Sequence, residues 1–141
     1  MKQIKAVVFV IILALIFSCQ SKDGQDQFCK STDGVEICYT QYGQGDNLVV
    51  FVHGWSCDKS YWREQIDFFK QDFQVVTIDL GGHGNSGMER ANWTMSAFGD
   101  DVNTVLKLFK FKNAYLVGHS MGSDVILESA SKWGENNIEL F

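Results

Sequence analysis

The sequence has no proline and no cluster of basic residues. Its 12 Lys and Arg residues are outnumbered by 17 Asp and Glu residues, which gives a formal net charge of −5. Such a chain offers no basic face to a phosphate backbone, so nucleic acid is excluded as an expected partner. Repeats and low-complexity tracts are also absent, and a content of 45% hydrophobic and 13% aromatic residues predicts one globular domain. We have no physical account of the missing proline.

The sequence also lacks an apolar run long enough for a permanent membrane span, which takes roughly 20 residues in a helix. The longest run, Ala6 to Phe17, follows Lys2 and Lys5 and is succeeded by a polar stretch. A basic start, a short apolar segment and a polar sequel are the features of an export signal. Residues 1–19 are therefore expected to be a signal peptide.

The end of this signal, Ile16-Phe17-Ser18-Cys19, resembles the bacterial lipobox, although Phe17 stands where a small or branched residue is usual. That resemblance implies cleavage before Cys19 and attachment of diacylglycerol to its sulfur. The protein would then be anchored by lipid to a membrane of the bacterial cell envelope, with residues 20–27 as a tether. An ordinary secretory signal, giving a secreted or periplasmic protein, and an uncleaved anchor remain the alternatives.

Export places the three cysteines that follow Cys19 in an oxidising compartment. Asp33-Gly34 lies between two short alternating runs and predicts a two-residue hairpin turn. Counting outward from that turn sets Cys29 opposite Cys38 at a non-hydrogen-bonded position, where the close Cα approach suits a disulfide. We expect a Cys29–Cys38 bridge and an unpaired Cys57; the alternative is two reduced cysteines in neighbouring strands.

Beyond the expected hairpin, Phe28 to Tyr42, short apolar runs alternate with segments of helical periodicity. The apolar runs, typical of strands buried on both faces, are Leu48 to Val52, Val75 to Leu80 and Ala114 to Gly118. The helical segments run from about Tyr61 to Phe73 with Asp58 or Ser60 as cap, from Thr94 to about Lys110, and from Met121 to Trp133. This alternation predicts an α/β fold with a mostly parallel, doubly wound sheet.

The third strand and third helix meet at Gly118-His119-Ser120-Met121-Gly122, a G-x-S-x-G pattern. On such a turn the serine backbone is strained and the hydroxyl projects above the sheet, while larger side chains at the two glycines would collide with neighbouring backbone. Ser120 is therefore the predicted nucleophile. The alternative is that Ser120 only caps the helix that follows.

Two backbone amides are expected to stabilise the oxyanion that forms when such a serine attacks a carbonyl. The N–H of Met121 lies at the start of a helix, beside Ser120. The second donor should come from the loop after a neighbouring strand, where His53-Gly54-Trp55 stands, so the N–H of Trp55 is predicted. The His53 side chain is expected to be satisfied by local backbone.

Three motifs in order make the chain resemble the α/β-hydrolase superfamily over about residues 33–133. They are H-G-W at 53–55, D-x-x-G-H-G-x-S at 79–86 and G-H-S-M-G at 118–122. The resemblance implies a serine hydrolase of the esterase, lipase or thioesterase kind, acting through an acyl-enzyme on a small ester or related substrate without metal or cofactor. It also implies a structural role in the second loop for Asp79, His83 and Ser86.

The family pattern breaks after the nucleophile, because the triad requires an acid and then a histidine later in the chain. The three histidines are His53, His83 and His119, and none follows Ser120. Asp124 and Glu128 lie on the helix behind the serine and are poor triad acids. Residues 28–141 are therefore expected to be a partial domain, the N-terminal half of a longer reading frame, with the nucleophile strand left as an open sheet edge.

Three functions stay open at this point. The first is a serine hydrolase that is catalytically incomplete in these residues. The second is a non-catalytic, α/β-hydrolase-like binding lipoprotein of the envelope. The third keeps the fold and serine but cleaves carbon–carbon bonds or carries out perhydrolysis. The aromatic residues Trp55, Tyr61 and Trp62 hint at an apolar substrate face, although such residues more often belong to a helix core.

Overall fold

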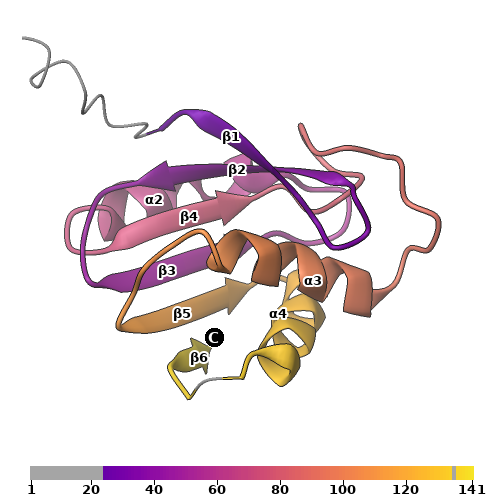
Figure 1. Ribbon diagram of the computed structural model, residues 1–141. Helices are drawn as coiled ribbons and strands as arrows, with labels where there is room; N and C mark the ends of the chain where they lie inside the picture. Colours follow the sequence, from indigo (N-terminus) through magenta and orange to yellow (C-terminus); the bar gives the residue numbers. More distant parts are fainter. Residues whose placement is uncertain (1–23, 135) are drawn as a thin grey trace, which may run out of the picture.

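A computed structural model describes residues 24–134 and 136–141 (Figure 1). The predicted signal peptide, the lipidation site Cys19 and the start of the tether lie outside these residues. The strands of the described part are β1 (Asp26–Lys30), β2 (Glu36–Tyr42), β3 (Asn47–Val52), β4 (Gln74–Ile78), β5 (Asn113–Gly118) and β6 (Ile138–Leu140). Its helices are a short 3-10 helix, η1 (Lys59–Trp62), followed by α2 (Arg63–Phe69), α3 (Met95–Leu106) and α4 (Met121–Lys132).

The strands form one mixed sheet in the order β1-β2-β4-β3-β5-β6. Strands β4, β3, β5 and β6 are parallel, whereas β2 is antiparallel to both of its neighbours. The central strands are largely apolar because helices cover both of their faces. Helices α3 and α4 lie on one side of the sheet and α2 on the other, which confirms the predicted mostly parallel α/β architecture (Figure 1).

Alternation along β3 shows how one strand serves two cores. Val50 belongs to the cluster beneath α3 and α4. Val49 and Phe51 belong to the cluster beneath η1 and α2, where Phe51 stacks on Trp62 with ring centroids 4.8 Å apart. Successive side chains point to opposite faces, so a six-residue strand contributes to both layers. Trp62 is thus part of the core.

The 3-10 helix η1 and helix α3 begin at capping residues that the sequence predicts. The Thr94 hydroxyl accepts a hydrogen bond from the N–H of Ala97 at 3.1 Å, and the Asp58 carboxylate accepts one from the N–H of Ser60 at 2.8 Å. Helix α3 ends at Leu106, however, earlier than the predicted end near Lys110. The N–H of Lys107 still bonds four residues back, to the Asn103 carbonyl. Those of Leu108 and Phe109 bond to carbonyls three residues back, so the final turn tightens out of α geometry.

The hairpin between β1 and β2 has a longer loop than the sequence predicts. A two-residue type I′ turn requires a positive φ at both Asp33 and Gly34, but only Gly34 has one, at 89°. The Gly34 N–H donates to the Ser31 carbonyl at 2.9 Å, and the Ser31 N–H donates to the Val35 carbonyl at 2.8 Å. The loop therefore has three residues, with Gly34 in the left-handed position that closes it.

That extra loop residue shifts the register, and the predicted Cys29–Cys38 disulfide is wrong. Cys29 pairs with Ile37, and Cys38 pairs with Phe28. A shift of one residue places the two cysteines on opposite faces of the sheet, and both are free thiols. Burial raises the pKa of each thiol to about 11, so both stay protonated at neutral pH.

The sheet extends further at both ends than expected. Strand β1 begins at Asp26, within the predicted tether, because Asp26 pairs with Thr40 and its carboxylate accepts a 2.8 Å hydrogen bond from the Thr40 hydroxyl. At the other end β6 pairs with β5 in parallel, from Ala114 opposite Ile138. The expectation that β5 forms an open edge is therefore wrong, and β6 is the edge strand of the described sheet.

Candidate active site

Ser120 occupies a sharp turn between the end of β5 and the start of α4. Its φ of 53° and ψ of −122° lie in a region that L-residues rarely adopt, at a cost on the order of 1–3 kcal/mol. The side chain makes no hydrogen bond to the start of α4, which contradicts the alternative that Ser120 serves as a side-chain cap. The residue is exposed, and the strain holds its hydroxyl clear of the helix.

Close backbone packing explains both glycines of this turn. A Cβ on Gly118 would lie 2.6 Å from the carbonyl carbon and oxygen of Gly122. A Cβ on Gly122 would collide with the carbonyl oxygen of Val52 and lie 2.7 Å from that of His53. The elbow therefore crosses directly over the end of β3, where the His119 N–H also donates to the Val52 carbonyl at 3.0 Å.

The loop after β3 packs against the elbow through Gly54. A Cβ on Gly54 would lie 3.1 Å from the Ser120 Cβ and 3.0 Å from the His119 carbonyl oxygen. Neither the N–H of Trp55, next in the loop, nor that of Met121 has an acceptor among the described residues. The Met121 N–H thus follows Ser120 in the chain, and the Trp55 N–H follows Gly54, which contacts Ser120. Two unpaired amide donors placed in this way can bind a negatively charged oxygen. Their role as an oxyanion hole stays a prediction.

His53 is fully engaged within the protein. Its Nε2 accepts a hydrogen bond from the N–H of Leu80 at 3.1 Å, so Nδ1 carries the proton and donates to the Gly54 carbonyl at 2.8 Å. The ring is completely buried, and that burial lowers its pKa. A neutral imidazole consequently ties the loop after β3 to the end of β4, as the sequence predicts.

The other two histidines have different surroundings. The Nδ1 of His83 lies 3.1 Å from the carbonyl oxygen of Gly81, within the same loop. The His119 ring stacks on Tyr61 with centroids 4.6 Å apart and an interplanar angle of 24°. His119 precedes Ser120 in the elbow, and its ring packs against Tyr61 of η1.

The loop after β4 is organised by the buried carboxylate of Asp79. It accepts hydrogen bonds from the Lys59 N–H at 2.7 Å, the Lys59 ammonium at 2.8 Å and the Asn85 N–H at 2.9 Å. Burial alone would lower the pKa of Lys59, but the contact with Asp79 raises it. The Ser86 hydroxyl donates to the Asp79 carbonyl at 2.6 Å and accepts from the Cys38 N–H at 2.8 Å. These bonds agree with the structural role predicted for this loop.

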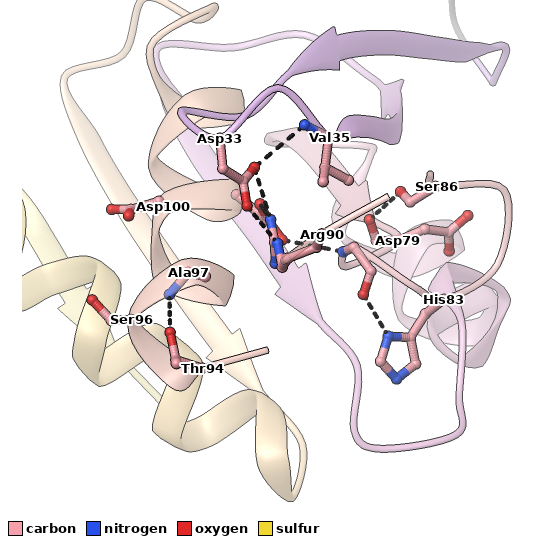
Figure 2. A network of polar contacts seen from close by, with 12 residues as sticks. Asp33, Val35, Asp79, His83, Ser86, Arg90, Thr94, Ser96, Ala97 and Asp100 are labelled. Carbon is pink, nitrogen blue, oxygen red and sulfur yellow. Dashed lines mark hydrogen bonds and ion pairs between the residues drawn. The ribbon is translucent and has the colours of Figure 1, made fainter. Parts of the chain in front are cut away.

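Sequence reasoning missed a second buried charge network, around Arg90 (Figure 2). Its guanidinium donates to both carboxylate oxygens of Asp101, at 2.6 and 3.1 Å, and to Asp33 at 2.7 Å. Burial would raise the pKa of Asp33, but the hydrogen bond from Arg90 lowers it. A signal was present: Asp101 stands three residues after Phe98, on the apolar face of its helix. An acid there needs a buried cation.

The two acids of α4 face solvent or a neighbouring helix. Asp124 is exposed, while Glu128 packs toward α3, with its Cβ 2.9 Å from where a Cβ on Gly99 would stand. No cluster of metal-ligating side chains occurs in residues 24–134 and 136–141. None of the helices in these same residues is long and apolar enough to cross a bilayer.

A largely parallel sheet with helices on both faces, and a strained serine between a central strand and a helix, define the α/β-hydrolase class. The chain belongs to the alpha/beta hydrolase fold family: residues 47–135, more than half of its 141, match that family's model.

Similar proteins carry several activities within this family. The chain is 32% identical to the non-heme chloroperoxidase CPO-A1 of Kitasatospora aureofaciens, over 78% of this chain and 40% of that protein. It is 37% identical to the bifunctional esterase/perhydrolase DCH of Acinetobacter calcoaceticus, over 79% of this chain and 41% of that protein. An esterase structure from Exiguobacterium antarcticum superposes with a TM-score of 0.74 at 27% identity, over 81% and 43%. The chain thus spans about two fifths of these curated relatives.

Proposed function

We propose that this chain carries the nucleophile half of a serine hydrolase that transfers the acyl group of a small ester, thioester or amide to water. The observation that carries the proposal is the backbone of Ser120, which is strained at φ 53° and exposed at the end of a central strand. A non-glycine residue held in such a conformation is best explained by a hydroxyl that must point at a substrate. The similarity to esterases supports the same reaction.

In this mechanism the Ser120 hydroxyl oxygen attacks the substrate carbonyl carbon while its proton passes to a histidine. The carbonyl oxygen becomes an oxyanion and accepts hydrogen bonds from the N–H groups of Trp55 and Met121. Collapse of the tetrahedral intermediate expels the leaving group, which takes the proton, and leaves an acyl-enzyme on Ser120. Water then attacks the acyl carbon while its proton passes to the same histidine. Collapse of the second tetrahedral intermediate expels the serine oxygen, which takes that proton, and releases the acid.

The histidine and its acid are proposed to come from outside these 141 residues. His53 is buried with both nitrogens bonded, and His119 stacks on Tyr61. Without a general base, donors of the oxyanion hole and substrate binding alone retain roughly 10³–10⁴-fold over the reaction in water. We therefore expect the 141 residues to bind substrate but to turn it over at a negligible rate.

A fluorophosphonate probe, which phosphonylates activated serines, tests both statements. The protein made from its natural gene should be labelled at Ser120, and the S120A variant should not. The S123A variant, three residues further along in α4, is the matched control and should keep the label. The isolated 141 residues should remain unlabelled. Labelling of the S120A variant would overturn the assignment of the nucleophile.

The main alternative is a non-catalytic lipoprotein that uses the same surface to bind a ligand. It is supported by the two unpaired amide donors beside the exposed Ser120, which can hold a polar group without any reaction. If the natural gene product fails to react with the probe while binding an ester isostere, this alternative replaces the hydrolase.

We also propose the lipid anchor at Cys19 and a location in the bacterial cell envelope, on the strength of the lipobox-like sequence before it. Growth of the host with an alkynyl fatty acid should label the wild-type protein and the C57S control, whereas C19S should lose the label and leave the membrane fraction. Labelling that survives in C19S would contradict the anchor at Cys19, and a wild-type protein that takes up no label would favour the secreted or periplasmic alternative.

A further inference from the structure

We propose that the pocket beside the loop after β3 binds a neutral, hydroxylated aromatic ring carried by the substrate, and this inference rests on the proposed hydrolase function. The pocket has a volume of about 330 Å³. Its lining comes from two loops that leave the same edge of the sheet: Trp55, Ser56, Gly82, His83, Met88 and Trp93. That volume lies within the range of small-molecule sites.

The pocket adjoins the reacting centre through two successive residues. Gly54 approaches the Ser120 Cβ, and Trp55, the next residue, lines the pocket. The N–H of Trp55 is also one of the two unpaired amides. Because Trp55 both lines the pocket and offers its N–H to the proposed oxyanion, a group held there would belong to the same substrate as the carbonyl that the serine attacks.

The walls favour an aromatic ring over an aliphatic chain. Trp55 meets His83 edge to face, with centroids 5.5 Å apart and an angle of 81°, which leaves ring faces and edges open to a further aromatic group. Met88, 71% exposed, adds a polarizable thioether. Three large apolar side chains gathered at one exposed place indicate a binding surface.

Trp93 is held as a fixed wall. Its indole packs on Gly82, where a Cβ would lie 2.7 Å from the ring, and the Arg90 guanidinium lies 5.5 Å from its centroid. The positive charge of Arg90 is paired with the carboxylates of Asp33 and Asp101, and the Arg90 side chain is 1% exposed. With no charged side chain in the lining, the pocket offers no counter-ion, so the bound group is neutral.

His83 supplies the polar contact. Its Nδ1 lies 3.1 Å from the Gly81 carbonyl oxygen and donates to it, and in the neutral ring this leaves Nε2 as the acceptor. This second nitrogen lies on the side of the ring away from Gly81 and has no partner in the described part of the chain (Figure 2). A hydroxyl on the bound ring would donate to it.

Three ketones test the pocket by titration calorimetry on the full chain: para-hydroxybenzylacetone, benzylacetone and methyl hexyl ketone. In each, a ketone replaces the ester carbonyl, so the compound cannot be hydrolysed. We expect both aryl ketones to bind more tightly than the aliphatic one, by up to about tenfold, and the hydroxylated ring to bind most tightly. Equal affinity for the aliphatic and aryl ketones would overturn the proposal.

Variants locate the binding and separate the two contacts. W93A should weaken both aryl ketones by about tenfold, with W93F recovering part of the loss. H83F keeps an aromatic ring but removes the acceptor, so it should abolish only the preference for the hydroxylated ketone. F68A removes an exposed aromatic side chain on α2, outside the pocket, and should change nothing; equal weakening by F68A and W93A would contradict the site.

The outcomes distinguish this inference from the proposed function. Aryl-selective binding without fluorophosphonate labelling of the natural gene product would overturn the hydrolase and leave a binding pocket. Labelling of Ser120 without any aryl preference would overturn the pocket alone.

Discussion

Two glycine-bearing loops meet at one edge of the sheet and are held in place by different physical forces. The elbow, residues 118–122, is fixed by backbone packed so closely that no side chain fits at Gly118 or Gly122. The loop after β4, residues 79–90, is fixed by buried carboxylates that bind its backbone N–H groups, Asp79 from within and Asp101 from α3. Steric exclusion is local and visible in a motif, whereas charge pairing joins residues far apart in sequence.

The largest expected effect comes from removing the charge that supports the second loop. D101A leaves the buried Arg90 with a single carboxylate and the Gly81 N–H without its acceptor. Breaking a buried ion pair from one side costs about 3–5 kcal/mol, and urea unfolding should show a loss of that size.

Asp100 provides the control, because it is the preceding residue and pairs with Lys132 at the surface. D100A should cost no more than about 1 kcal/mol. R90M/D101L replaces the pair with apolar groups and should recover much of the stability lost in D101A. Equal losses in D100A and D101A would contradict a supporting role for the buried charge.

The next effect tests the steric account of the elbow. In G118A the new Cβ would press on the Gly122 backbone at 2.6 Å, and the unfolding free energy should fall by about 3 kcal/mol or more. Gly134 has nothing within 4 Å of an added Cβ and no positive φ, so G134A should stay within about 0.5 kcal/mol of the wild type. A tolerant G118A would mean that the elbow relaxes and is not sterically fixed.

A smaller effect, of opposite sign, measures the strain at the serine. Glycine adopts a positive φ without steric strain, so S120G should raise the unfolding free energy by about 1 kcal/mol. The same substitution should abolish any fluorophosphonate labelling. S131G, in the last turn of α4, should lower it by about 0.5 kcal/mol, since glycine is a poor helix former. Thermal or urea unfolding of the pair separates the two signs; a destabilised S120G would contradict stored strain.

The smallest effect concerns His53, whose side chain joins the loop after β3 to the start of the loop after β4. Because burial depresses its pKa in the folded state, only the unfolded chain takes up a proton just below the ordinary value of 6.5. The contribution of a neutral His53 is therefore complete above pH 6.5 and declines as the pH falls toward the folded-state pKa. H53Q should be less stable than the wild type at pH 8, and the difference should narrow at pH 5. A difference that is independent of pH would refute the assignment.

The fold and the elbow were accessible from local pattern. Apolar runs predict strands such as Val75 to Leu80, because a strand covered on both faces must be apolar along its whole length. Gly118 and Gly122 predict the tight crossing, because the residues that exclude one another lie within a few positions. The cap at Thr94 is predictable for the same reason, because the unpaired N–H groups of a helix's first turn need an acceptor close by in the sequence.

Register and long-range pairing were not accessible in this way. The hairpin loop differs from its prediction by one residue because Asp33 keeps a negative φ, and that single step separates Cys29 from Cys38. The ion pair between Arg90 and Asp101 joins a loop to a helix whose contact depends on how the layers pack. The aromatic pocket likewise exists only because Trp55 and Trp93 arrive from different loops at one edge of the sheet.

The order of residues along this chain thus specifies which segments become strands and helices and where the strained serine lies, since these depend on contacts between near neighbours. Folding in three dimensions adds the strand register, the buried charges that hold the second loop, and the pocket beside Ser120. Those features arise from distances between residues that are remote in sequence, which no local pattern encodes.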